Sequence, residues 1–148
     1  MPFGYDELKD FLSAYCRAYS QYAGAPDTIG QLHRFWAPDL TAVAFFRRGD
    51  NGDYPIVHDG RDAFQQAILA NQSHFRDTME PLDMVIDTIS NKVAVMSKIV
   101  KTDIKTGEIV TIHGMGKYEI KPHSNGQPMI AAIHFFWDAP ETVKKRSR

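Results

Sequence analysis

The second half of the chain alternates long β-forming segments with very short turns, and this pattern restricts the fold more than any other feature. Candidate strands lie at 78–87, 92–103, 108–121 and 128–137, and the turns between them are short and contain Asn or Gly. Connections this short join antiparallel strands, because a parallel crossover needs a dozen or more residues. The sequence therefore predicts a long antiparallel meander.

Helical periodicity dominates the first half. Apolar residues recur at three- and four-residue steps over 6–22, which predicts an amphipathic helix, and shorter helices are expected over 27–35 and 63–73. Residues 40–47 are rich in β-formers, and 54–58 is expected to be a short returning strand. Three N-terminal helices followed by hairpins indicate an α+β fold, in which the helices cover one face of a curved antiparallel sheet.

Length, charge and cysteine usage narrow the function classes. The chain has 148 residues with 17 Lys+Arg against 18 Asp+Glu, so one domain is expected over 1–140, followed by a basic, disordered tail over 141–148. A balanced charge argues against a nucleic-acid partner. The longest uncharged stretch, 122–137, is too short to span a membrane, and residues 1–10 lack the features of a signal peptide. We expect a cytoplasmic protein in which Cys16, the single cysteine, is a buried and inert thiol.

Two aromatic segments flank the expected strands. They are Phe35-Trp36-Ala37-Pro38-Asp39, before the first expected strand, and Phe135-Phe136-Trp137-Asp138, at the end of the last one. With this layout the chain resembles the SnoaL-like branch of the nuclear transport factor 2-like superfamily. The resemblance implies a cone-shaped, cystatin-like roll that holds a small apolar or aromatic ligand and forms a homodimer through the open face of its sheet. The superfamily includes polyketide cyclases, ketosteroid isomerase, scytalone dehydratase and proteins that only bind or dimerise, so the fold alone chooses no activity.

His74 follows the helix expected over 63–73, and its Ser-His-Phe context resembles the histidine base of scytalone dehydratase. An imidazole with an unperturbed pKa near 6.5 can remove a proton at neutral pH. The alternative is a histidine stabilised by the dipole at a helix C-terminus. Another member of the superfamily, hexachlorocyclohexane dehydrochlorinase, has a similar histidine base and an Asp at the end of its first helix that orients it. In this chain residues 23–26, Ala-Gly-Ala-Pro, occupy that position and carry no carboxylate. The next residue, Asp27, is better explained as the cap of the following helix.

Comparison with ketosteroid isomerase gives less support for isomerase chemistry in this chain. The resemblance places Ala44 where the isomerase has its aspartate base, and Gly116 near its oxyanion-hole aspartate. Neither residue can transfer a proton. Tyr15 or Tyr19 on the first helix can still serve as a hydroxyl donor, although a tyrosine on an apolar helical stripe is often only a core residue.

Strand alternation predicts which side chains share a face. The resemblance places Gly114, Gly116 and Tyr118 inside the cone, where the glycines either widen a pocket or allow the sheet to curve. On the last strand His134 and Phe136 share one face, and the sequence leaves open whether it points inward. Inside the cone His134 is a second acid or base; outside, it belongs to a dimer interface.

Two hypotheses remain for the function. The first is an enzyme that performs cofactor-free proton transfer, such as dehydration, isomerisation or cyclisation, with His74 as base, Tyr15 or Tyr19 as donor and His134 as partner. Ligand contacts are expected from Tyr19, Trp36, Tyr118 and Phe136. We expect no metal and no cofactor, because histidine pairs with metal-ligand spacing and phosphate-cradling Gly-rich loops are missing from the sequence. The second hypothesis is a non-catalytic ligand-binding or dimerisation module of the same fold.

Overall fold

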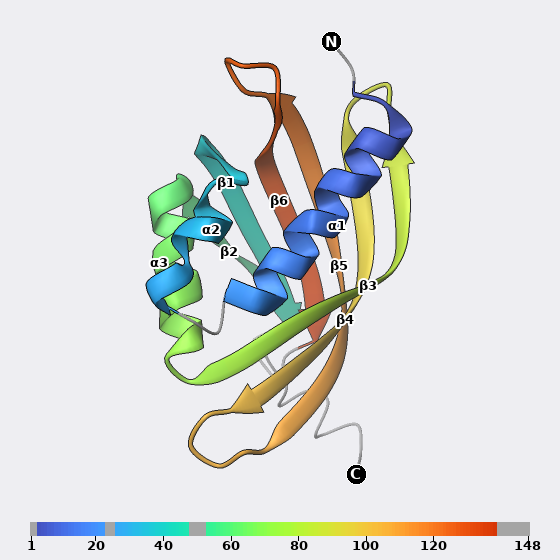
Figure 1. Ribbon diagram of the computed structural model, residues 1–148. Helices are drawn as coiled ribbons and strands as arrows, with labels where there is room; N and C mark the ends of the chain where they lie inside the picture. The colour runs from blue at the N-terminus through green and yellow to red at the C-terminus, as the bar shows by residue number, and fades with distance from the viewer. Residues whose placement is uncertain (1–2, 23–25, 48–52, 139–148) are drawn as a thin grey trace.

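The computed structural model describes residues 3–22, 26–47 and 53–138 (Figure 1). The tail expected over 141–148 lies outside the described residues. The elements, in chain order, are α1 (Tyr5–Tyr22), the 3-10 turn η1 (Pro26–Thr28), α2 (Gly30–His33), β1 (Trp36–Arg47), β2 (Asp53–Asp59), α3 (Arg61–Gln72), β3 (Phe75–Asp87), β4 (Lys92–Asp103), β5 (Ile109–Pro122) and β6 (Pro128–Asp138). None of the described helices is long and apolar enough to cross a membrane.

The strands form one curved six-stranded sheet in the order β2-β1-β6-β5-β4-β3. Strands β3 to β6 make the predicted antiparallel meander, and the α+β fold class is confirmed. One neighbouring pair is parallel: β1 runs beside β6 in the same direction. The rule for short turns concerns consecutive strands only, so it carries no information about this pair.

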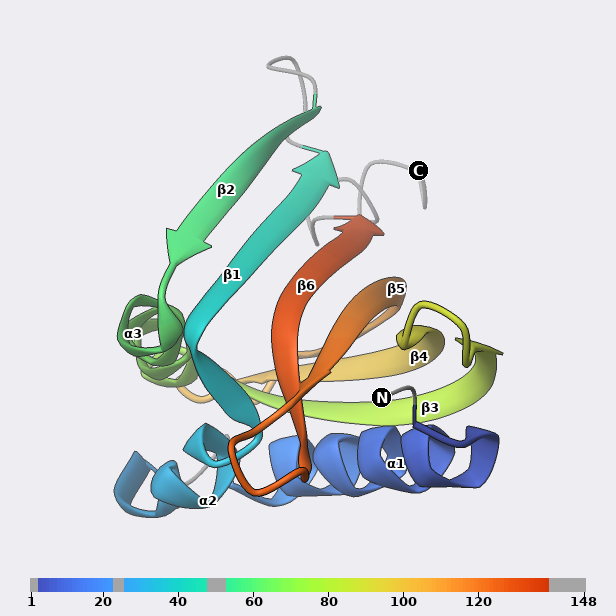
Figure 2. The same ribbon diagram turned by 90° about the horizontal axis from the view of Figure 1, so that it is seen from above.

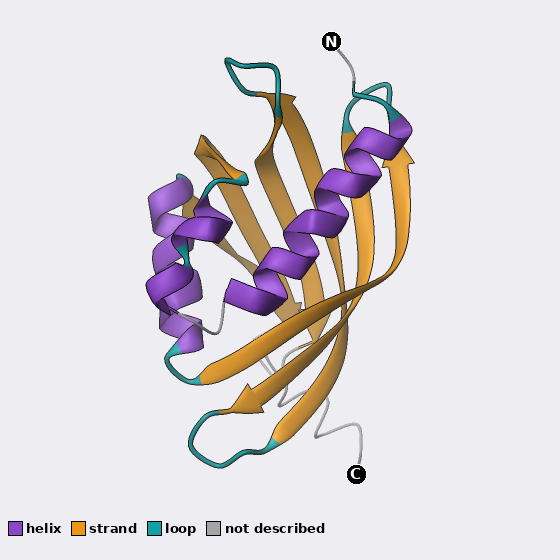
Figure 3. Ribbon diagram, viewed as in Figure 1, coloured by secondary structure: helices purple, strands orange, loops and turns teal. Residues whose placement is uncertain are grey.

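The helices lie on the concave side of the sheet. Figures 2 and 3 show α1 running along the sheet across the inner side, with α2 and α3 near the β1–β2 edge. A hydrogen bond from the Ser20 hydroxyl to the Met79 carbonyl, at 3.1 Å, and one from the Met79 N–H back to that hydroxyl, at 2.8 Å, fix α1 to β3. These two bonds hold α1 against the inner side of the sheet at β3.

The apolar face of α1 packs into the core on the concave side of the sheet. Leu8 and Leu12 are fully buried and belong to the same core as Val93 and Val95 of β4. Each such side chain contributes roughly 1.5–3 kcal/mol when it leaves water, so the predicted helical stripe is the main anchor of the helix. Burial raises the pKa of the Cys16 thiol to about 12, which agrees with the inert thiol expected from the sequence.

A bulge in β6 decides which of its faces points inward. The pairing with β5 shifts between Glu119 and Ile120, so that Ala131 is an extra residue. As a result Ile130 and Ile133 are both buried, although strict alternation would place them on opposite faces. Beyond the bulge Ile133 and Phe135 face the concave side, whereas the two residues whose orientation the sequence left open, His134 and Phe136, lie on the convex face.

Candidate functional site

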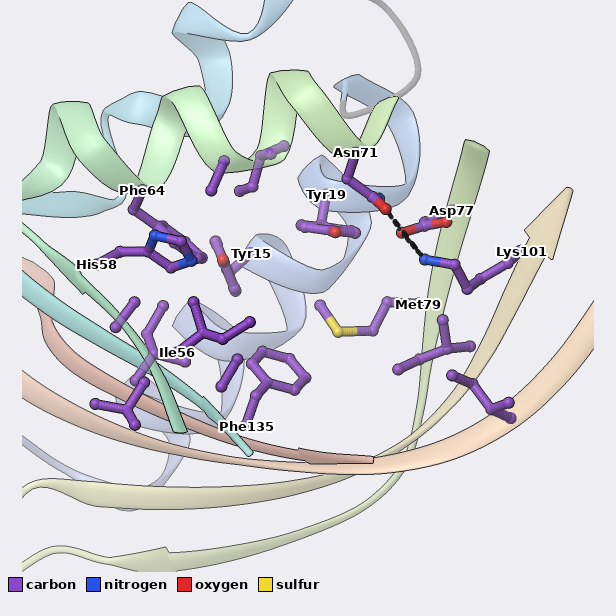
Figure 4. Close-up of a pocket in the computed structure, with 18 residues that line it drawn as sticks. Tyr15, Tyr19, Ile56, His58, Phe64, Asn71, Asp77, Met79, Lys101 and Phe135 are labelled. Atoms are coloured by element: carbon purple, nitrogen blue, oxygen red, sulfur yellow. Dashed lines mark hydrogen bonds and ion pairs between the residues drawn. The ribbon is translucent and has the colours of Figure 1, made fainter. Parts of the chain in front are cut away.

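A cavity of about 410 Å³ lies between α1, α3 and the concave face of the sheet (Figure 4). Most of the side chains that line it are apolar and come from both helices and all six strands; they include Ile56, Ile68, Met79, Ile99, Ile112 and Phe135. A mostly apolar cavity of this size with a few polar groups is typical of a site for a small organic molecule. The polar groups gather at two ends.

At one end Trp36 fixes the hydroxyl group of Tyr15. The indole N–H of Trp36 donates to the Tyr15 oxygen at 3.2 Å, and both side chains are buried. Burial is the main cause that raises the pKa of Tyr15, and the bond from Trp36 opposes it. Because Trp36 can only donate, the Tyr15 hydroxyl accepts here and its own proton is left for a group in the cavity.

His58 of β2 lines the same end. Its ring lies 6.0 Å from the ring of Phe64, centroid to centroid, and the Phe64 ring lies 5.0 Å from that of Trp36. Desolvation lowers the pKa of His58 below its usual 6.5, so the imidazole is neutral at pH 7. We call Tyr15, His58 and Phe64, together with Trp36 packed behind them, the aromatic end.

The other end of the cavity is charged. The Asp77 carboxylate accepts a hydrogen bond from the Asn71 amide at 2.8 Å and pairs with the Lys101 ammonium at 3.3 Å, and Lys101 also donates to Asn71 at 3.3 Å (Figure 4). The Asp77 side chain is only 6% exposed and that of Lys101 14%. Lys101 also lies 4.8 Å from the ring centroid of Phe75. We call Asn71, Asp77 and Lys101 the polar end.

Helix α3 sets the distance between the two ends. Phe64 and Asn71 both line the cavity and are separated by seven residues, which is two helical turns or about 10 Å. Tyr19 lines the cavity between the ends (Figure 4). Burial, then the Asp77 carboxylate and then Tyr15 raise the pKa of Tyr19, so this hydroxyl stays protonated. The site therefore suits an elongated molecule with a polar group at each end.

His74 is exposed and does not line the cavity, which corrects its expected role as the base. It follows the end of α3 in a turn in which its N–H donates to the Asn71 carbonyl. The expected strand began at Thr78, whereas β3 begins at Phe75. Strand alternation then buries Asp77 and leaves His74 at the surface.

His134 and Phe136 also lie away from the cavity. The bulge places them on the convex face, where Phe136 is 43% exposed. The structure therefore does not bring them to the cavity, where His134 was considered as a second acid or base and Phe136 was expected as a ligand contact. For an outward-facing His134 the sequence analysis expected a place in a dimer interface, and that role stays a prediction.

Trp36 and Tyr118, two of the expected ligand contacts, are fully buried behind the cavity wall. The Tyr118 ring packs edge-on against Tyr15 at 5.8 Å and against Phe135 at 6.0 Å. Gly116 leaves room for it, since a Cβ there would lie 2.7 Å from the Tyr118 ring. This glycine makes space for a core ring rather than for a ligand.

The sequence analysis did not name His58 or Asp77 as residues of the site. The strand expected over 54–58 already placed His58 on the same face as Ile56. A strand that began early enough to include Asp77 would likewise have placed Asp77 on the same face as Met79. Both signals become informative only when the inward face is known. Within the described residues, no three His, Cys, Asp or Glu side chains come together as a metal site requires.

Comparisons with known proteins show which fold this is. No protein-family model matches the chain, and no curated protein matches it. Among solved structures, a ketosteroid isomerase-like protein from Erwinia carotovora atroseptica has a TM-score of 0.67 at 14% identity, with 91% of this chain and 96% of that chain covered. An NTF2-like protein of unknown function from Burkholderia pseudomallei has a TM-score of 0.67 at 13% identity, with 93% and 95% covered.

A third structure, AusH from Aspergillus nidulans, has a TM-score of 0.71 at 15% identity, with 93% of this chain and 88% of that chain covered. Identities this low establish architecture and leave activity to the residues of the site. The curved sheet, the helices on its concave side and these neighbours agree with the resemblance found in the sequence: the chain has the fold of the nuclear transport factor 2-like superfamily.

Proposed function

We propose that the protein is a cofactor-independent enzyme that moves a proton within a small hydrophobic carbonyl compound. One observation carries the proposal: a neutral imidazole, His58, and an oriented hydroxyl, Tyr15, line the same end of an apolar cavity. The histidine base expected from the sequence is thus assigned to His58 instead of His74. Tyr19 and Phe135 supply walls for the ligand.

The reaction needs no co-reactant. The unprotonated ring nitrogen of His58 takes a proton from the carbon next to the carbonyl group, and the electron pair left behind forms an enolate. The enolate oxygen accepts the hydrogen bond that Tyr15 donates. His58 then returns the proton to the same carbon or, in a conjugated substrate, to a more distant one, which gives an isomerised product with balanced atoms and charge.

Hydrogen–deuterium exchange tests the proposal without knowledge of the natural substrate. Hydrophobic ketones such as 4-acetylbiphenyl are incubated with the protein in D₂O, and deuterium at the carbon next to the carbonyl is followed by NMR. We expect exchange to be at least about 100-fold faster with the wild type than with His58→Gln, and slower with Tyr15→Phe. Equal rates for wild type and His58→Gln would contradict the proposal.

A non-catalytic ligand-binding module is the second candidate, and Ala44 favours it. Its methyl group lines the cavity at the position that resembles the base of ketosteroid isomerase. A ketone that binds with a measurable Kd and shows no enzyme-dependent exchange would support this candidate. The matched control is His74→Gln, because His74 is exposed and lies outside the cavity.

The expected homodimer is also a proposal. On the convex face Met96, Met115 and Phe136 stand opposite one another across three neighbouring strands, and Met96 and Phe136 are both 43% exposed. A row of large apolar side chains on an open sheet is a suitable contact for a second copy of the chain.

A further inference from the structure

The proton transfer proposed above leaves one hydroxyl group of the cavity, that of Tyr19, without a role. Tyr19 lies four residues after Tyr15 on α1, and both side chains line the cavity (Figure 4). Residues four apart share a face of a helix and are separated by about 6 Å along its axis. The two rings meet edge-on with their centroids 6.5 Å apart. The helix therefore carries two phenol groups to the cavity at a fixed spacing.

The two hydroxyl groups differ in their surroundings. The Tyr15 oxygen accepts the hydrogen bond of the Trp36 indole at 3.2 Å. The Tyr19 oxygen has no hydrogen-bond partner within residues 3–22, 26–47 and 53–138, and it is not among the partnerless oxygens that the fold seals from contact, such as that of Tyr118. It therefore keeps accessible surface, and the Tyr19 side chain is only partly buried.

The missing partner can come from a molecule in the cavity. Most of the other side chains that line the cavity are apolar and offer the Tyr19 hydroxyl no hydrogen bond. A ligand that displaces water from this hydroxyl without replacing its hydrogen bond loses affinity. A ligand that replaces the bond is preferred over an analogue that lacks the necessary atom, because the analogue leaves the hydroxyl unpaired.

Tyr19 is suited to donate this hydrogen bond. Burial, then the Asp77 carboxylate, raises its pKa, so the hydroxyl keeps its proton. A phenol oxygen shares a lone pair with its ring and therefore donates a hydrogen bond more strongly than it accepts one. The proton of Tyr15 is also left for the cavity, because Trp36 can only donate to that oxygen. A matching ligand then offers two acceptors, one to each tyrosine.

We infer that Tyr19 determines specificity by donating a hydrogen bond to a second oxygen of the ligand. The ligand class is a hydrophobic molecule with two acceptor oxygens about 6 Å apart, such as an aromatic diketone. That the first oxygen belongs to a carbonyl group held by Tyr15 rests on the proposed function. The contact with Tyr19 itself depends only on the accessible hydroxyl.

A matched pair of ligands tests the inference. 1,4-Diacetylbenzene carries two acceptor oxygens, and in 4-isopropylacetophenone an isopropyl group of similar shape replaces one acetyl group. NMR titration at pH 7 gives the Kd of each compound for the wild type and for Tyr19→Phe. We expect the substitution to weaken binding of the diketone about three- to tenfold, which corresponds to one hydrogen bond, and to change binding of the monoketone by less than about twofold.

Tyr5→Phe is the control. Tyr5 begins the same helix, is 53% exposed and lies outside the cavity lining, so this variant should bind both compounds as the wild type does. Tyr19→Phe should also unfold at the same urea concentration as the wild type, because it loses no hydrogen bond within the described part of the chain. Unfolding at a clearly lower concentration would reveal a partner inside the protein and would overturn the inference.

The remaining outcomes separate the two proposals. The Tyr19 contact would be refuted if the diketone did not bind the wild type, if Tyr19→Phe weakened both compounds equally, or if it weakened neither. The proposed reaction is followed independently, by deuterium exchange at the methyl groups next to the carbonyls. Selective loss of diketone binding without any exchange would keep the Tyr19 contact and remove the reaction. Exchange that depends on His58, without that selective loss, would do the reverse.

Discussion

The indole N–H of Trp36 donates a hydrogen bond to the hydroxyl oxygen of Tyr15 across 3.2 Å of buried space. The bond joins the first residue of β1 to the middle of α1, and it is at once a structural contact and a means of orienting the Tyr15 proton. A group with both roles should change stability and chemistry together when it is removed.

Tyr15→Phe is expected to destabilise the protein by about 1–3 kcal/mol, because the Trp36 N–H then loses its partner inside the core. Urea unfolding at pH 7 measures this change. Trp36→Phe, in contrast, removes the donor and leaves the hydroxyl without orientation, so it should slow deuterium exchange while 4-acetylbiphenyl still binds. An unchanged unfolding free energy for Tyr15→Phe would show that the bond contributes nothing.

Gly116→Ala is expected to destabilise the protein by about 1–3 kcal/mol through overpacking. The new Cβ would lie 2.7 Å from a ring carbon of Tyr118, which is fully buried between Tyr15 and Phe135 and cannot move aside. Gly30→Ala is the matched control, since nothing lies within 4 Å of a Cβ at that position. Thermal melting of the two variants compares them directly. A Gly116→Ala protein as stable as Gly30→Ala would contradict this account of the glycine.

The meander and the helical face of α1 could be predicted from sequence because local patterns determine both. Short turns force consecutive strands to pair, and the four- and three-residue steps between Leu8, Leu12 and Tyr15 define a buried stripe. The expected bounds of β4, 92–103, are those of the structure. The parallel pairing of β1 with β6 joins distant segments, and no local pattern encodes it.

The site residues were harder to predict because a side chain's direction depends on strand register. A start of β3 at Phe75 instead of Thr78 decides whether Asp77 belongs to a loop or to the inward face. One extra residue, Ala131, sets the faces of Ile130 and His134. Chemical context alone singled out His74, which is exposed, whereas the cavity receives His58, whose sequence neighbours suggest no chemistry.

The pH dependence of stability should report on His58. Its pKa in the folded protein is lowered by desolvation, so the unfolded chain binds more protons than the folded one once the pH falls below about 6.5. Stability is therefore expected to be full above that pH and to decrease as the pH falls from 6.5 through the lower folded pKa. The lowered pKa values of Asp39, Asp87 and Asp103 stabilise the folded protein equally throughout this range, because that contribution is lost only as the pH falls below about 3.8.

Urea unfolding of the wild type and of His58→Gln between pH 4.5 and 7.5 isolates this contribution. The unfolding free energy of the wild type minus that of His58→Gln should increase as the pH rises across this window. The rate of deuterium exchange should fall over the same range, since a protonated imidazole cannot take a proton. A constant difference across the window would mean that His58 titrates as it does in water.

Substitutions on the convex face test the proposed homodimer. Phe136→Lys places a charge in the row formed with Met96 and Met115, and burying that charge in an interface costs more than the apolar contact contributes. We expect the wild type to be a dimer by light scattering and Phe136→Lys to be a monomer at micromolar concentration. Ile89→Lys is the control: Ile89 is 93% exposed but lies in the turn after β3, so its variant should remain dimeric. A monomeric wild type would contradict the homodimer. A dimer that Ile89→Lys dissociates and Phe136→Lys does not would place its contact outside the row on the convex face.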